Sequence, residues 1–384
     1  MKVKKILKIV LCVVLALVIV VGGYLAYVFI DYHRLSDRQE LTVHVLYKGG
    51  VLLDNDDYPT IEPATGTRYR IASYNIGFGA YSDDYGFFMD GGTESRARSA
   101  EAVVANIGGA VDTLGACSPD LMLIQEVDTD GTRSYHIDES ELLLEDLSTH
   151  FAETALFYDF AQNYDSPYLM YPLTSPHGAN KAGIMTFSSF SIDSALRRSL
   201  PIETGFTKFL DLDRCYSVSR IPVTNAYGAQ ADELVLYNLH LSAYTSDGTI
   251  ATEQLRMLLE DMQNEYENGN YCIAGGDFNK DLLGDSAAYF GASDIEYTWA
   301  QPIPPETFDG VEIQLVAPLD EASPVPSCRN ADGPYHEGQY VLTVDGFLVS
   351  PNVQVIESNV IDTQFRYSDH NPVYMDFVLM PYKT

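Results

Sequence analysis

Basic residues are scarce after the first 35 positions of the chain. Residues 36–384 contain 18 Lys and Arg against 53 Asp and Glu, a net formal charge of −35. Such a surface does not attract nucleic acid through broad electrostatics, because like charges repel each other. An acidic protein can still act on a polyanion where metal ions supply the local positive charge. The simplest interpretation of the charge is solubility at a cell surface.

Cysteine is scarce too, and residues 68–382 lack repeats, low-complexity tracts and linkers. The four cysteines after the N-terminal segment have spacings that match no zinc site or disulfide framework: Cys117, Cys215, Cys272 and Cys328. One or two disulfides stay open as an alternative. Cys272 lies in an apolar run, so we expect a buried thiol there. About 315 uninterrupted residues indicate one large domain built from packed layers.

The N-terminus, by contrast, is rich in apolar residues. Four lysines precede an uncharged run, Ile9–Ile30, whose 22 residues suffice to cross a bilayer core of roughly 30 Å. We predict a cytoplasmic tail at 1–8, a transmembrane signal-anchor helix at 9–30 and a juxtamembrane segment at 31–67. The lysines place the N-terminus in the cytoplasm and the remainder outside the cell membrane. A signal peptide cleaved near Val21–Gly23 is the alternative, and no protein partner is predicted.

Runs rich in Val, Ile, Tyr and Phe recur along the chain and predict strands. Two segments between them have helical spacing instead. Residues 96–116 place apolar side chains at intervals near 3.6, and residues 251–269 do the same, with Gly269 as the expected C-terminal cap. Strands first alternate with helices and later follow one another. This order predicts an α+β sandwich with a mixed sheet.

The most informative stretch is Tyr271–Asp281, YCIAGGDFNKD. An apolar run that predicts a strand meets two glycines, and Asp277 and Asn279 follow on either side of Phe278. Gly, Asp and Asn are common turn residues, so a turn is one interpretation. If the strand continues, Asp277 and Asn279 share one face while Phe278 points to the core.

Polar residues stand at the ends of other predicted strands as well. They are Asn75 in YNIGFG, Glu126 in IQEVD, His240 in NLHLSA, Asp345 in VDGFLVS, and Asp369 and His370 in SDHNPV. Each alone has a structural explanation, such as a turn, a solvated carboxylate or a core histidine. Together they exceed what turn chemistry explains. Because strand ends of a packed sheet form one rim, we expect these side chains to converge on one cleft.

These residue types favour metal-assisted hydrolysis of a phosphate ester. Hard oxygen ligands, which favour Mg²⁺ or Mn²⁺ over zinc, are offered by Asn75, Glu126, Asp277, Asn279 and Asp369. Asp277 or Asp369 can act as a base on water, and the two histidines can stabilise or protonate oxygens on phosphorus. Asp345 can fix the tautomer of His370, as a carboxylate does in a catalytic triad.

In these six motifs, which occur in order across residues 68–380, the chain resembles the endonuclease/exonuclease/phosphatase superfamily. Its members include deoxyribonuclease I, neutral sphingomyelinases and inositol polyphosphate 5-phosphatases, and GDFN and SDHNPV are the most specific motifs. The resemblance implies a four-layer α/β sandwich, two central mixed β-sheets flanked by helices, as a catalytic domain at 68–382. It also implies that Glu126 is the main metal ligand, supported by Asn75 and Asp369.

The resemblance assigns the remaining site residues to catalysis. Asp277 would position or activate the attacking water, and Asn279 would bind the scissile phosphate. His240 and His370 would stabilise the transition state or help the leaving group. Asp345 would hold His370 in place.

Residues that select the substrate are less clearly marked. Tyr164 resembles a tyrosine that contacts phosphate in nuclease relatives, and Lys181 lies in a stretch similar to one of the inositol phosphatases. Lys181 either binds phosphate or is an ordinary exposed lysine. Arg214 and Arg220 either face the cleft or balance the acidic surface. The loop Tyr81–Ser99 is expected to pack locally, with a lid or a lipid-contacting lip as alternatives.

Three functions fit this sequence. The first is a membrane-anchored, extracellular phosphodiesterase or nuclease that uses Mg²⁺ or Mn²⁺. The second is a phospholipase C-like, sphingomyelinase-like or phosphomonoesterase activity on lipid head groups or small phosphate esters. The third is a non-catalytic surface module, which ranks last because no motif residue is missing.

Overall fold

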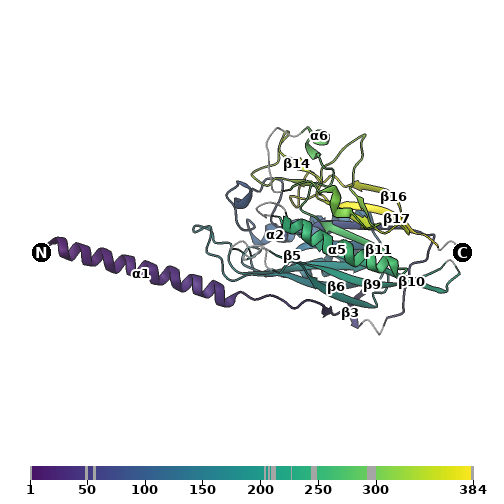
Figure 1. The fold of residues 1–384 in the computed structure, drawn as a ribbon, viewed down its shortest axis with the longest axis horizontal. Helices are drawn as coiled ribbons and strands as arrows, with labels where there is room; N and C mark the ends of the chain where they lie inside the picture. Colours follow the sequence, from purple (N-terminus) through teal and green to yellow (C-terminus); the bar gives the residue numbers. More distant parts are fainter. Residues whose placement is uncertain are drawn as a thin grey trace.

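The computed structural model describes residues 2–47, 51–54, 58–202, 205, 208, 213–225, 227–243, 249–291 and 300–381. A long helix, α1 (Lys2–Asp31), projects from a sandwich of two β-sheets (Figure 1). The predicted end of the catalytic domain, residue 382, lies outside the described residues.

Eight strands form the first sheet within the described residues. Their spatial order is β16 (Val353–Val360), β17 (Val373–Leu379), β4 (Arg68–Asn75), β5 (Leu121–Gly131), β7 (Asn180–Ser188), β6 (Leu156–Asp165), β2 (His44–Tyr47) and β3 (Val51–Asp54). The pair β4–β5 is parallel and the other pairs are antiparallel, so the sheet is mixed.

Seven strands form the second sheet in the same part of the chain. Their order is β1 (Gln39–Leu41), β8 (Ser194–Ser199), β9 (Cys215–Thr224), β10 (Gln230–His240), β11 (Tyr271–Asp277), β15 (Asp345–Val349) and β12 (Gln314–Val316). Here β10 and β11 form the parallel pair. A separate two-stranded ribbon joins β13 (Cys328–Arg329) to β14 (Val341–Leu342).

Helices complete the outer layers. α2 (Ala100–Cys117) and α3 (Glu139–His150) pack on the first sheet, and α5 (Thr249–Glu267) packs on the second. Short helices lie in the loops: η2 (Gly77–Gly79), η3 (Phe88–Asp90), α6 (Ser286–Phe290) and η4 (Pro305–Phe308). The predicted fold class, a four-layer α/β sandwich with two mixed sheets, is therefore confirmed.

The alternating side chains of β5 show how the layers hold together. Leu121 and Leu123 enter the apolar cluster between the two sheets, whereas Met122 and Ile124 pack under the helices. All four are fully buried. A strand with both faces buried must be apolar at successive positions, which explains the continuous run LMLI at the start of β5.

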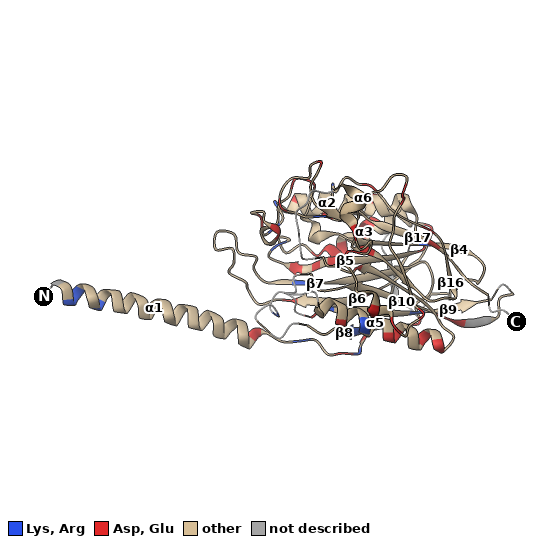
Figure 2. Ribbon diagram, turned by 45° about the horizontal axis from the view of Figure 1, so that its top comes forward, with Lys and Arg blue, Asp and Glu red and all other residues tan. Residues whose placement is uncertain are grey.

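The segment predicted to be juxtamembrane, 31–67, contributes β1 to the second sheet and β2 and β3 to the first. The limits of the catalytic domain stay a prediction. α1 itself is a candidate membrane span by length and composition, a test that a signal sequence also passes. Figure 2 shows basic residues near the free end of α1 and acidic residues at many positions along the ribbon of the domain.

Candidate active site

Three neighbouring strands of the second sheet bring three predicted site residues side by side. His240 ends β10, Asp277 ends β11 and Asp345 begins β15. In the ladder, His240 is the partner of Asp277, and Asp277 is the partner of Asp345. The register of the sheet therefore sets their spacing, because paired residues of adjacent strands lie within about 5 Å.

The first sheet faces this row with Asn75 and Glu126. Glu126 has a positive φ of 58°, at a shift of the β5–β7 register between Ile124 and Val127. A β-bulge of this kind redirects a side chain out of the strand's normal alternation. Asn75 Nδ2 donates to Glu126 Oε1 over 3.2 Å and to Asp277 Oδ2 over 3.1 Å, while its Oδ1 accepts from the Gly77 amide. In this arrangement Asn75 holds two carboxylates in place.

Asn279 reaches the site by a different route from the one that strand alternation predicts. β11 ends at Asp277, and Asn279 has a left-handed φ of 49°. The Asn279 amide donates to Asp277 Oδ1 over 2.8 Å, which is an Asx turn. The expectation of a continuing strand was wrong at this position, although Phe278 is buried in the core as predicted.

The two glycines before Asp277 are required by close packing. A Cβ at Gly276, where φ is 145°, would lie 2.0 Å from the Leu239 carbonyl oxygen of the neighbouring strand. A Cβ at Gly275 would lie 2.8 Å from the Leu123 side chain in the other sheet. Any side chain here would push the two sheets apart, and the site spans both sheets.

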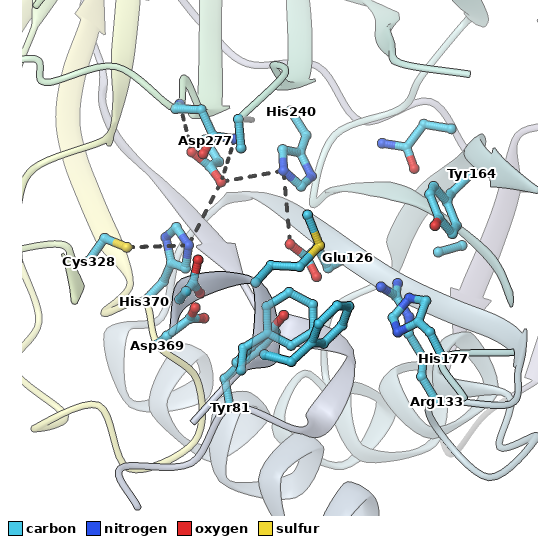
Figure 3. Close-up of a pocket in the computed structure, with 18 of the residues that line it drawn as sticks. Tyr81, Glu126, Arg133, Tyr164, His177, His240, Asp277, Cys328, Asp369 and His370 are labelled. Atoms are coloured by element: carbon cyan, nitrogen blue, oxygen red, sulfur yellow. Dashed lines mark hydrogen bonds and ion pairs between the residues drawn. The ribbon is translucent and has the colours of Figure 1, made fainter. Parts of the chain in front are cut away.

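His370 is held by a buried carboxylate. Its Nδ1 lies 2.8 Å from Asp345 Oδ2, which also accepts a hydrogen bond from Ser327 Oγ. Its Nε2 points into the site, 3.8 Å from Asp277 Oδ2. His240 Nε2 lies 3.5 Å from the same oxygen and 3.9 Å from Glu126 Oε1 (Figure 3). Asp277 thus stands between the two histidines.

The two histidines carry different charges near neutral pH. Burial, together with the nearby charges of Arg214, His370 and Arg133, lowers the pKa of His240 well below its usual value, so this ring is neutral. Burial also opposes protonation of His370, but Asp345 and Asp277 outweigh it and raise its pKa well above the usual value. A neutral donor and a cation on either side of one carboxylate are a typical acid–base arrangement.

The carboxylates fit a divalent cation. Burial raises the pKa of Asp277 to about 7, and it raises that of Asp369 to about 7 as well, with Glu126 adding to the effect on Asp369. Anionic groups that are buried together resist ionisation, and a cation bound among them removes this cost. A compact group of Asp277, Asp345 and His370, whose ligand atoms lie within 4.8 Å of one another, adjoins the predicted oxygen ligands.

Six of the predicted site residues line a cavity of about 520 Å³: Glu126, His240, Asp277, Asn279, Asp369 and His370. Asn75 and Asp345 lie behind them and contact them through hydrogen bonds. Tyr164 and Arg214, both predicted to contact substrate, line it too. Lys181 is exposed and does not line it, so the structure does not bring this lysine to the other site residues. Arg220 forms ion pairs with Glu233 and Glu265, which agrees with its predicted alternative of balancing acidic charge.

Sequence reasoning missed three further cavity residues, which Figure 3 labels: Arg133, His177 and Cys328. Arg133 is buried, pairs with Asp128 and lies 3.9 Å above the Phe78 ring. Cys328 Sγ lies 3.7 Å from His370 Nε2. None of the three stands in a motif, and only the long-range packing brings them to the cleft.

The loop Tyr81–Ser99 packs locally, as predicted, and it also lines the cavity. Tyr81, Tyr85 and Phe87 are buried in the cluster beneath α2, with edge-to-face ring contacts, so local packing is confirmed. Phe88 and Met89 are only half-buried and line the cavity. The loop is therefore one wall of the cleft.

A model described as the Endonuclease/Exonuclease/phosphatase family matches residues 72–370. No curated protein matches the sequence significantly.

Solved structures share the fold at low sequence identity. An endonuclease/exonuclease/phosphatase from Beutenbergia cavernae has a TM-score of 0.53 and 17% identity, covering 82% of this chain and 72% of that one. A family protein from Leptotrichia buccalis has a TM-score of 0.51 and 16% identity, covering 80% and 99%. ANGEL2, described as a 2′,3′-cyclic phosphatase, has a TM-score of 0.51 and 14% identity, covering 84% and 98%.

Proposed function

Because the chain belongs to the endonuclease/exonuclease/phosphatase family, we propose that it is a divalent-metal-dependent phosphoester hydrolase acting on phosphodiesters. The observation that carries this proposal is the convergence of both sheets on Asp277. His240 and Asp345 flank it in the second sheet, and Asn75 and Glu126 face it from the first. A non-catalytic module would not need one neutral and one protonated histidine around one buried carboxylate.

The chain's own residues supply the proton chemistry. Asp277 orients the attacking water and accepts its proton, since its carboxylate has a pKa of about 7. His240, which is neutral, donates a hydrogen bond to a phosphoryl oxygen. His370 carries a proton on Nε2 and stabilises the departing oxygen, and Asp345 is its positioning residue. Asn279 contacts the phosphate from its turn.

Glu126 and Asp369 would hold Mg²⁺ or Mn²⁺, with Asn75 next to them. The bound ion supplies positive charge for the phosphate oxygens. Hard carboxylate oxygens in a partly open cleft are the donors that these cations prefer. Tyr164 and Arg214 line the same cavity and are the substrate contacts of this proposal.

The proposed location is the cell membrane, with α1 as a single span and the domain outside. The four lysines before the span support this orientation. Protease added to intact cells should then digest the domain. Digestion only after lysis would contradict the orientation.

A substrate panel tests the function directly. Full-length chain in detergent micelles, with Mg²⁺ or Mn²⁺, is offered a bis-aryl phosphodiester, plasmid DNA, RNA, sphingomyelin and a phosphoinositide, beside His240→Ala. We expect hydrolysis that disappears in the variant. Cutting of nucleic acid would support the nuclease predicted first from the sequence, and release of a head group would support the lipid alternative. If no substrate is cleaved, the proposal is wrong.

Asp345→Asn should move the pH dependence of hydrolysis. Without the neighbouring charge, the pKa of His370 falls, so the protonated ring is lost at lower pH and the alkaline limb of kcat/KM shifts to lower pH. We expect kcat to fall by about 10- to 100-fold, as for other residues that orient a functional histidine. A pH profile of kcat/KM is the measurement. A uniform loss of rate with the limb unmoved would show a merely structural role.

A further inference from the structure

The C-terminal end of α1 forms hydrogen bonds with one loop of the catalytic domain, residues 168–173. Tyr24 Oη donates to the Tyr168 carbonyl over 3.2 Å and accepts from the Met170 amide over 3.0 Å. Tyr27 Oη accepts from the Tyr168 amide over 3.0 Å. Two tyrosines of the candidate span thus bind the backbone of the 168–173 loop.

These contacts fix the position of the loop along the axis of α1, and therefore its depth if α1 spans a bilayer. Tyr24 lies seven residues before Asp31, where α1 ends, which is about 10 Å along a helix axis. The loop therefore lies beside the last two turns of the apolar helix. In a bilayer this is the interfacial zone, where tyrosine is favoured.

Backbone N–H and C=O groups of this loop have hydrogen-bond partners within the protein. Leu169 and Gly178 exchange two hydrogen bonds of 3.0 Å, and the His177 amide donates to the Tyr171 carbonyl over 3.1 Å. With the tyrosine contacts, six backbone groups of residues 168–171 have partners within the protein. A segment that enters lipid needs this, since unpaired backbone groups are costly there.

Its side chains are apolar and exposed. Leu173 is 80% exposed, Tyr171 69% and Met170 45%. Residues 166–177 contain no Asp, Glu, Lys or Arg, in a chain whose outer part has a net charge of −35. An uncharged, exposed apolar loop beside a membrane anchor matches a membrane-contacting segment.

The same elements form the entrance of the active site. Tyr24, Leu169 and Tyr171 line the cavity that holds Asp277 and His370. Phe88, which also lines the cavity, lies 5.6 Å from Tyr171 between ring centres. Apolar residues of the candidate membrane span, of the 168–173 loop and of the Tyr81–Ser99 loop therefore share one cavity with the carboxylates.

We infer that the substrate is a membrane lipid with a phosphoester head group, taken from the bilayer that anchors the chain. This inference rests on the proposed function. The water oxygen forms a bond to phosphorus, one ester P–O bond breaks, and the proton of the water passes to the departing alcohol. The membrane anchor keeps the active site close to the lipid. Electrostatic attraction does not do this, because an acidic domain is not attracted to anionic lipid.

The test compares lipid with soluble substrate in one preparation. Full-length chain is reconstituted with Mg²⁺ or Mn²⁺ in vesicles of phosphatidylcholine, phosphatidylethanolamine, phosphatidylglycerol and sphingomyelin. Lipid products are measured by mass spectrometry beside turnover of a soluble bis-aryl phosphodiester. We expect lipid cleavage, and at least a tenfold fall in the ratio of lipid to soluble turnover in Met170→Glu/Leu173→Glu. Neither side chain lines the cavity.

Tyr227→Glu is the matched control. Tyr227 is 96% exposed and lies in the β9–β10 turn, at the opposite end of β10 from His240. This variant should leave the ratio unchanged. Cleavage of the soluble diester without any lipid would overturn the inference and leave the proposed function standing. Cleavage of neither would overturn both, and an unchanged ratio in the loop variant would refute the role of the loop.

A second measurement does not depend on activity. The sequence contains one tryptophan, so a new tryptophan is easily compared with the parent. Emission from Leu173→Trp should be quenched strongly by lipids with brominated acyl chains, whereas emission from Tyr227→Trp should not. Equal quenching of the two would place the loop outside the membrane and overturn the inference.

Discussion

Asp277→Ala is expected to lower the rate of phosphodiester hydrolysis by about a thousandfold, within the range for loss of a general base. The carboxylate lies between His240 and His370 and accepts hydrogen bonds from Asn75 Nδ2 and the Asn279 amide. No other described carboxylate contacts both histidines. The rate is measured on the soluble bis-aryl diester.

Asp277→Asn is the companion variant, because it keeps the side-chain volume. Burial raises the pKa of Asp277 from 3.8 to about 7, so the folded state holds a proton that the unfolded state releases between these values. The metal-free protein therefore loses stability as pH rises through this window, and asparagine removes that loss. We expect Asp277→Asn to be inactive, with an unfolding midpoint at pH 7 no lower than that of the parent.

Asp159→Asn is the matched control for both variants. Asp159 is also buried, with a pKa raised by burial to about 7, and it accepts a hydrogen bond from Ser219 Oγ over 2.6 Å. It does not line the cavity. We expect its activity to stay close to that of the parent. More than a tenth of the parent activity in Asp277→Asn would contradict the assignment of Asp277 as the general base.

Removal of divalent metal should abolish hydrolysis, and Mg²⁺ or Mn²⁺ should restore it. Cation binding requires ionised carboxylates, and burial holds the pKa of Asp277 and of Asp369 at about 7 without it. Metal affinity should therefore weaken as pH falls from 8 to 6, with release of protons on binding. At 100 times the dissociation constant, the metal should stabilise the fold by about 2.7 kcal/mol.

Calorimetry and thermal unfolding measure these effects. Glu126→Gln should bind metal at least about tenfold more weakly, because it removes the charge of the main proposed ligand. Asp159→Asn should bind as the parent does. Full activity after chelation and dialysis, or proton uptake on metal binding, would contradict the metal assignment.

The elements that the sequence predicted well are those with local signals. Residues 100–117 and 249–267 form helices because their apolar side chains repeat at helical spacing, and both helices bury that face. Asn75, His240, Asp277 and Asp345 stand at strand termini as predicted, and the register of β10, β11 and β15 brings three of them into one row. Their convergence follows from parallel and antiparallel pairing at one rim. Glu126 does not end its strand, because β5 continues to Gly131, and Asp369 and His370 lie in the loop before β17.

The features that could not be predicted from the sequence depend on local backbone conformation or on contacts between residues far apart in the chain. The bulge that turns Glu126 into the cleft and the Asx turn at Asn279 have no local signature beyond ordinary turn residues. Cys328 and His370 are 42 positions apart in the chain, and only folding brings them together. The stretch LTVHVLY is strand-like in sequence and contains β2, but β1 and β3 have no strong local pattern. Pairing of β1 with β8 and of β3 with β2 defines these two strands.

The pairing of β17 with β4 has a consequence for how the enzyme is made. The final strand joins the first sheet beside β4, with Val373 opposite Ser73, and it follows directly after Asp369 and His370. Asp369, His370 and β17 therefore leave the ribosome after every other described strand of the first sheet. Any premature stop before residue 379 removes part of this closure. The first sheet cannot be completed, and His370 cannot be brought to Asp277, until this strand has been synthesised.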